Sequence, residues 1–90
     1  KRLEAEFRKK LTPYKKQLTT SEKQMDAFTT RLSEIEEQLG DSTLYDQENK
    51  KLLTDLLKEQ GEVKEQLEDT EMLWMDAQEK IELLQAEFEA

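Results

Sequence analysis

The 90-residue sequence contains no cysteine and no histidine, and it has only two glycines and one proline. Without cysteine or histidine, the chain offers no disulfide framework, no zinc finger and no histidine-based catalytic triad. Gly40 and Gly61 are too few for a Walker loop, a dinucleotide-binding fingerprint or a nucleophile elbow. The longest apolar run covers residues 72–75, so no segment is predicted to span a membrane. We therefore expect no catalytic residue, no metal site and no membrane partner for this chain.

Charge is what the sequence has in abundance, with 40% charged and 34% hydrophobic residues. A single globular core is marginal at this length, and so few apolar residues fill it poorly. Two amphipathic helices that pack along a narrow seam need apolar residues at only two positions in seven. The composition therefore favours a coiled coil. The chain does not begin with methionine and shows no signal peptide, so we interpret it as a segment of a larger cytoplasmic protein.

The apolar residues fall into two series in which spacings of three and four alternate. The first series has nine apolar or aromatic residues among ten positions: Phe7, Leu11, Tyr14, Leu18, Ser21, Met25, Phe28, Leu32, Ile35 and Leu39. The second has nine among eleven: Leu53, Leu56, Gln60, Val63, Leu67, Thr70, Trp74, Ala77, Ile81, Leu84 and Phe88. Heptads sustained over this length, with Glu, Lys and Gln between them, indicate a coiled coil.

Two interruptions set the expected helix boundaries. Gly40 can close a helix in the left-handed conformation, and Asp46 is a suitable residue to start the next one. Pro13 follows Thr12, a competent N-cap, and proline breaks the interior of a helix. Gly61 costs about 1 kcal/mol relative to alanine, but it is predicted to lie within a helix.

The predicted fold is therefore all-α and forms a single domain over residues 1–90. We expect a short basic helix over residues 1–11, a break or kink at the proline, and a helix over residues 13–39. A tip over residues 40–46 and a second helix over residues 47–88 complete the prediction.

Charge favours an antiparallel hairpin within one chain over a parallel dimer. Residues 1–20 hold seven Lys/Arg and two Asp/Glu, whereas residues 61–90 hold two and ten. A hairpin places the +5 segment beside the −8 segment, while a parallel dimer would align like charges. A connector of eight residues, counted from residue 39 to residue 46, also suits antiparallel neighbours. We therefore expect a monomeric hairpin.

The predicted register pairs positions of one series with positions of the other in constant layers. The expected pairs are Ile35 with Leu53, Leu32 with Leu56, Met25 with Val63, Leu11 with Ala77, Phe7 with Ile81 and Tyr14 with Trp74. A shift by one heptad preserves the same apolar pattern, so the sequence leaves that alternative open.

Most of the polar and aromatic clusters have a structural interpretation. The acidic runs at residues 34–37 and 65–71 are interpreted as solvated helix faces, because catalytic carboxylates need a cleft that shifts their pKa. Trp74, Tyr14 and the phenylalanines lie at heptad spacing, which favours packing in the seam over a role as stacking platforms.

The basic segment is the first candidate functional site. Seven cations lie within the first sixteen residues. They either complement the acidic second helix or contact the phosphates of a nucleic acid, and lysines on the outer face remain free in both cases. The candidate phosphate-contacting residues are Lys9, Lys10, Lys15, Lys16 and Lys23. The overall net charge of −8 opposes tight nucleic-acid binding by the isolated chain.

The tip is the second candidate. Leu44 and Tyr45 are apolar residues outside both heptad series. They either fold back to cap the last layer of the seam or contact a partner at the end of the rod.

Three segments together resemble a known domain. They are residues 12–18 (TPYKKQL), residues 39–46 (LGDSTLYD) and residues 68–74 (EDTEMLW), and the second fits the pattern L-x-D-x-x-L-Y. Their order and spacing resemble the C-terminal coiled-coil domain of bacterial ABC-F ATPases over essentially the whole chain. The resemblance implies a parent protein with two ATP-binding cassettes that acts on ribosomes. It also implies that ATP and magnesium bind outside this segment, which itself holds no cofactor.

Two functional hypotheses follow. The first is a non-catalytic appendage that assists the binding of a ribosome or nucleic acid. The second is a protein-interaction or spacer coiled coil without a nucleic-acid role.

Overall fold

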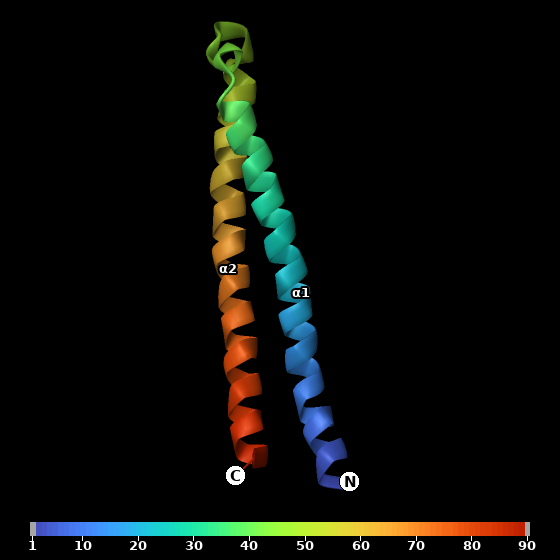
Figure 1. Ribbon diagram of the computed structural model, residues 1–90. Coiled ribbons are helices and arrows are strands. Elements are labelled where there is room, and N and C mark those ends of the chain that lie inside the picture. Colours follow the sequence, from blue (N-terminus) through green and yellow to red (C-terminus); the bar gives the residue numbers. More distant parts are fainter. Residues whose placement is uncertain (1, 90) are drawn as a thin grey trace.

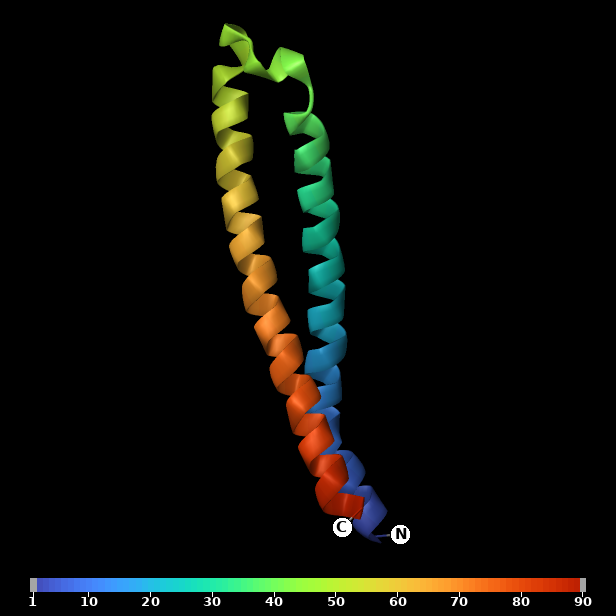
Figure 2. The same cartoon turned by 60° about the vertical axis from the view of Figure 1, so that its left-hand side comes forward.

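The computed structural model describes residues 2–89 as a rod of two antiparallel helices with both chain ends at its base (Figure 1). Helices α1 (Arg2–Leu39) and α2 (Lys50–Glu89) pack against each other and are joined by two 3-10 turns, η1 (Ser42–Tyr45) and η2 (Gln47–Asn49). The rod measures 68 × 15 × 15 Å. The predicted all-α antiparallel hairpin is confirmed, and the view in Figure 2 shows that the helices remain neighbours when the rod is turned.

The two heptad series form the seam between the helices. On α1 all ten predicted positions are buried or half-buried, and only Gln17 and Arg31 join them. On α2 ten of the eleven are buried or half-buried, and Phe88 at the base is exposed. Within residues 2–89, neither helix contains an apolar stretch that is long enough to cross a lipid bilayer.

The register of the seam differs from the predicted one. Phe7 stacks on Phe88, with ring centroids 4.3 Å apart, one heptad beyond the expected partner Ile81. The indole nitrogen of Trp74 donates a hydrogen bond to Glu22, and no ring pair between Trp74 and Tyr14 occurs within residues 2–89. The predicted pairs at these positions are therefore wrong.

Small residues explain part of this displacement. Gln17 bonds across the seam to the Leu73 carbonyl, and this contact brings Ser21 and Thr70 to the same level of the rod. Both are buried, so the observed register gathers two small polar side chains in one layer. The constant layers of the predicted register would instead place Ser21 opposite Leu67 and Thr70 opposite Leu18.

Pro13 does not break the helix. α1 runs continuously from Arg2 to Leu39 with Pro13 inside it, so the separate helices over residues 1–11 and 13–39 are a wrong prediction. Proline removes one hydrogen bond, to the Lys9 carbonyl, and both residues lie on the exposed side of the helix where water reaches them. The seam residues on either side, Leu11 and Tyr14, hold the helix to its partner.

The tip also differs from the prediction. Neither glycine has a positive φ, so Gly40 does not end α1 in the left-handed conformation. Its N–H is shared between the carbonyls of Glu36 and Glu37, at 3.1 and 3.2 Å, which tightens the last turn. Helix α2 begins at Lys50, because Gln47–Asn49 forms a 3-10 turn where the sequence predicted the start of the helix. Gly61 lies within α2, as expected.

Candidate nucleic-acid interface

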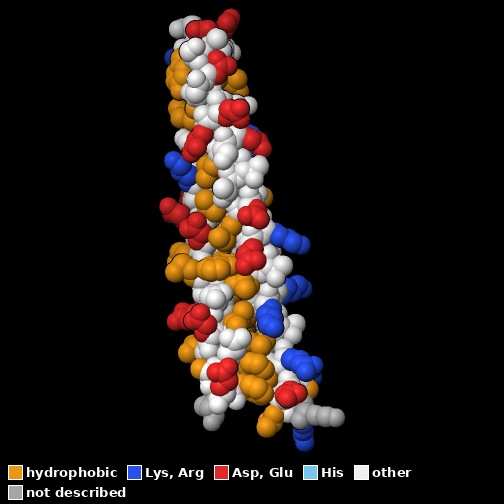
Figure 3. Space-filling view, in the orientation of Figure 1, with side chains coloured by type: hydrophobic (Ala, Val, Ile, Leu, Met, Phe, Trp, Pro, Cys, Tyr) orange, Lys and Arg blue, Asp and Glu red, His pale blue; other side chains and the backbone are white. Residues whose placement is uncertain are grey.

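Three of the five predicted lysines form a single row on α1. Lys9, Lys16 and Lys23 are seven residues apart, so they share one face and follow each other at about 10.5 Å along the axis. All three are exposed, and the row lies opposite the seam. We call these three residues the lysine row. In Figure 3, most of the visible Lys and Arg side chains project from the α1 side of the lower half of the rod.

The other two lysines flank the lysine row on different sides. Lys15 lies about a quarter turn around α1 from Lys16 and is exposed. Lys10 lies on the opposite flank and lines a groove of about 280 Å³ at the base of the rod, together with Phe7 and Phe88. The structure therefore brings three of the candidates to one outer face and places Lys15 and Lys10 on its two flanks.

The five candidate lysines form no ion pair with the acidic helix in the part of the chain that the structure describes. The ion pairs within residues 2–89 are Arg2–Glu6, Arg31–Glu34, Arg31–Glu59 and Lys51–Asp55, and none includes a candidate lysine. The basic segment runs beside the acidic end of α2 as expected, and Lys10 lines the groove at the base of the rod together with Glu6 and Glu87 without forming an ion pair. The charge of the five lysines is consequently available to an external anion.

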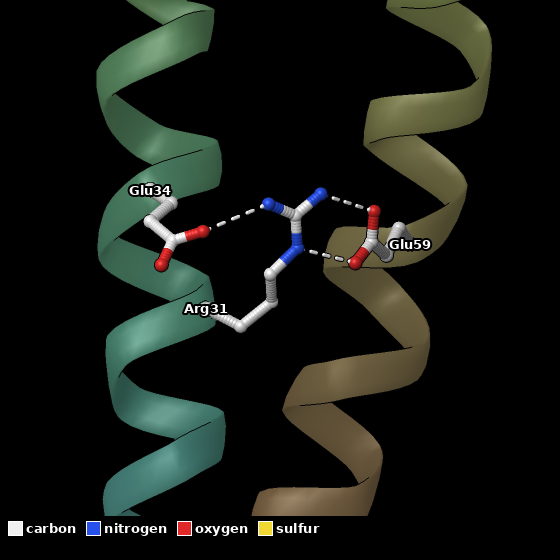
Figure 4. Close-up of polar contacts among 3 residues, drawn as sticks. All are labelled: Arg31, Glu34 and Glu59. Carbon is white, nitrogen blue, oxygen red and sulfur yellow. Dashed lines mark hydrogen bonds and ion pairs between the residues drawn. The ribbon is translucent and has the colours of Figure 1, made fainter.

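A different cation joins the helices. Arg31 donates two hydrogen bonds to Glu59 across the seam, at 2.5 and 2.6 Å, and a third to Glu34 at 3.1 Å (Figure 4). Hydrogen bonding from Arg31 lowers the pKa of Glu59, and the two carboxylates raise the pKa of Arg31. The sequence analysis missed this contact, although Arg31 is the only cation between Lys23 and Lys50.

The two candidate residues at the tip, Leu44 and Tyr45, differ in their exposure to solvent. Leu44 is buried against Ile35 and Leu56, so it caps the last layer of the seam. Tyr45 is 59% exposed, while its hydroxyl donates to the Leu39 carbonyl at 2.7 Å. Only Tyr45 therefore presents surface to a partner.

Hydrogen bonds hold the tip in one shape. The Asp41 carboxylate accepts from the hydroxyl and the backbone N–H of Thr43, and these two bonds hold the pKa of Asp41 below its usual range. The Asn49 amide donates to the Thr43 carbonyl at 2.9 Å. These hydrogen bonds tie η1 to η2 and to the residue that precedes η1.

A second groove borders the lysine row. It has a volume of about 370 Å³ and is lined by Pro13, Lys16, Gln17, Thr20, Ser21, Gln24 and Leu73. The sequence analysis missed it, because the groove depends on the register of the two helices. Within residues 2–89, no group of three or more acidic side chains is arranged to hold a metal ion.

Comparison with known proteins identifies the relatives of this chain. A protein of Escherichia coli (strain K12), described as "Probable ATP-binding protein YheS", is 44% identical over 82 residues, which is 91% of this chain and 13% of the relative. This chain is homologous to the C-terminal region of YheS. The Haemophilus influenzae protein of the same description is 53% identical over 47 residues, which is 51% of this chain and 7% of that relative.

The chain spans about an eighth of the length of the E. coli YheS protein that it matches. No family model matches the sequence, and no solved structure matches it significantly. The homology to YheS therefore rests on the sequence alone. The structure shows that the matching residues of this chain form a helical hairpin.

Proposed function

We propose that this chain is a non-catalytic C-terminal appendage of a soluble, cytoplasmic ABC-F-type ATPase, and that it assists the binding of ribosomal or other nucleic acid. The relationship to YheS supports an origin in a larger ATP-binding protein. ATP and magnesium bind in the remainder of that protein, where its ATPase activity resides. The hairpin contributes a charged surface to the assembly and takes no part in the chemical step.

The observation that carries this proposal is the lysine row. Lys9, Lys16 and Lys23 are exposed, lie on one face and have no ion-pair partner within residues 2–89. A row of cations that extends over about 21 Å from Lys9 to Lys23 can run alongside a phosphate backbone and contact several of its phosphates. Lys15 and Lys10 extend the positive surface on either flank.

Electrostatics also limits the strength of this interaction. The acidic end of α2 lies about one helix diameter behind the row, on the same rod. Contacts to phosphate are therefore local, and their affinity falls steeply as added salt screens the lysines and competes for the phosphates. The isolated hairpin therefore binds nucleic acid weakly. Its contacts add to the total affinity when the rest of the protein already holds the same target.

Charge reversal of the lysine row tests the proposal. The variant Lys9→Glu/Lys16→Glu/Lys23→Glu is titrated against a labelled single-stranded RNA and against purified ribosomes. We expect at least about tenfold weaker binding, and a plot of log affinity against log salt whose slope is shallower by about 2, at about 0.7 for each lost phosphate contact. Circular dichroism checks that helix content is unchanged.

A matched variant controls for net charge. Lys58→Glu/Lys64→Glu/Lys80→Glu changes the charge by the same amount on exposed positions of α2. We expect it to bind much more tightly than the lysine-row variant. Equal affinity of the wild type and the lysine-row variant would contradict the proposal and favour a spacer role for the hairpin.

A further inference from the structure

Helix α2 carries an apolar stripe that has no role in the hairpin. Met72, Met75 and Leu83 are 68%, 62% and 55% exposed, and their spacing places them on one face of the helix. We call these three residues the methionine stripe. Figure 3 shows hydrophobic side chains at the surface on the α2 side of the rod, among Asp and Glu side chains.

The stripe lies on the opposite side of α2 from the seam. Thr70, Ala77 and Ile81 are buried against α1 in the same part of the helix. Half a helical turn separates these residues from the stripe, so the stripe points away from α1. Single exposed apolar residues are ordinary, but here three lie on one face within about three turns, with carboxylates between and beside them. Methionine is flexible and polarisable, which suits it to contact an apolar partner surface.

Carboxylates surround the methionine stripe. Glu68, Asp76 and Glu79 lie on the same face, and none of them takes part in an ion pair within residues 2–89. A nucleic acid or an anionic lipid would be repelled by this surface. A partner that buries the stripe must instead offer apolar side chains with cations beside them.

We infer that the methionine stripe is a docking surface for a basic amphipathic helix of a partner protein. The stripe spans about 16 Å along the axis, which matches about three turns of an apposed helix. Apolar residues of the partner cover Met72, Met75 and Leu83, while its Lys and Arg side chains pair with the flanking carboxylates. An interface of this size is at the small end of specific contacts, so the complex is transient.

This surface is separate from the lysine row. The row lies on the outer face of α1 and the stripe on the outer face of α2, with the seam between them. A nucleic acid and a basic protein segment can therefore occupy the rod together. The inference does not depend on nucleic-acid binding, because different residues carry it.

Binding of a designed peptide tests the inference. The probe is a labelled helix-forming peptide of leucine and lysine with amphipathic periodicity, and its control is the same composition in scrambled order. We expect Met72→Gln/Met75→Gln/Leu83→Gln to weaken binding of the amphipathic peptide at least about tenfold, because these changes remove apolar contacts and keep every charge. The scrambled peptide should bind weakly to both proteins.

Two further variants sharpen the comparison. Leu52→Gln/Leu57→Gln changes two half-exposed leucines elsewhere on α2 and should leave the affinity unchanged. Glu68→Gln/Asp76→Asn/Glu79→Gln should weaken binding and reduce its dependence on salt. Single variants replace the triple one if circular dichroism shows a loss of helix.

Three outcomes would overturn the inference. The first is an unchanged affinity after substitution of the stripe. The second is equal binding of the ordered and scrambled peptides, which would reduce the contact to charge alone. The third is a concentration-dependent dimer in sedimentation equilibrium that the stripe variant abolishes, since the occupant would then be a second copy of this chain.

Discussion

At the tip of the rod, Ile35, Leu44 and Leu56 form an enclosed cluster, whereas at the base Phe7 and Phe88 stack beside an open groove of about 280 Å³. The tip half, residues 25–66, also contains the Arg31–Glu59 contact and a hydrogen-bonded cap. The base half, residues 2–24 and 67–89, contains the lysine row and the methionine stripe.

The two halves therefore differ in how well their seam residues are buried and in how their cations are paired. Ile35 is completely buried, while Phe88 at the other end is 46% exposed. In the tip half Arg31 pairs with Glu59 across the seam, whereas within residues 2–89 no lysine of the base half forms an ion pair. We therefore expect the tip half to supply more of the stability, and we propose that the base half supplies the binding surfaces.

The largest expected effect is at the core of the tip half. Ile35→Ala should lower the free energy of unfolding by about 2–5 kcal/mol, because it leaves a cavity among Leu44, Leu56 and their neighbours. Phe88→Ala should cost clearly less, since its ring is already half in water. Urea titrations followed by circular dichroism measure both. A greater loss for Phe88→Ala would reverse the assignment of stability to the tip half.

A smaller, pH-dependent effect is expected at Glu59. Its pKa is lowered by hydrogen bonding to Arg31, so the folded state favours the carboxylate. The advantage of the wild type over Glu59→Gln is therefore complete above the unfolded pKa, near 4.5, and is lost as the pH falls through the still lower folded pKa.

Melting temperatures of the two proteins between pH 7 and pH 2 check this dependence. Comparing the two proteins removes the effect of the other acidic groups, which titrate in both. An advantage that grows as the solution becomes more acidic would show that the Arg31–Glu59 contact does not stabilise the tip half.

The smallest expected effect is a stabilisation. Gly61 lies within α2, and a methyl group added there meets no other atom within 4 Å. Gly61→Ala should raise the free energy of unfolding by about 0.5–1 kcal/mol, because glycine loses more backbone freedom on folding. Thermal melting measures the change. A destabilised variant would indicate that the helix needs flexibility at this position of the tip half.

The seam could be predicted from sequence, but its register could not. The alternation of three and four identifies the inward face because it depends only on the helical period. A displacement of one helix along the other again pairs apolar with apolar residues, so periodicity alone does not place Phe7 beside Phe88. The sequence also did not reveal that α1 continues through Pro13. Contacts along the seam outweigh the one hydrogen bond that proline removes, and these contacts depend on the tertiary structure.

The candidate interface was partly predictable. The spacing of Lys9, Lys16 and Lys23 places them on one face whatever the tertiary structure. Their lack of partners was not predictable, because it depends on which way that face points relative to α2. Leu44 shows the opposite case, as a residue outside the heptad series that becomes part of the core when the tip folds back.

We propose that the base half of α1 binds nucleic acid, and we expect the tip half to contribute more to the free energy of unfolding. The most direct test is an NMR titration of the labelled chain with a single-stranded RNA, in which backbone shifts are followed residue by residue. We predict that the shifts concentrate on residues 8–24 of α1 and leave the tip and the outer face of α2 unchanged. Shifts centred on Tyr45 and the tip, with the lysine row unaffected, would contradict the account.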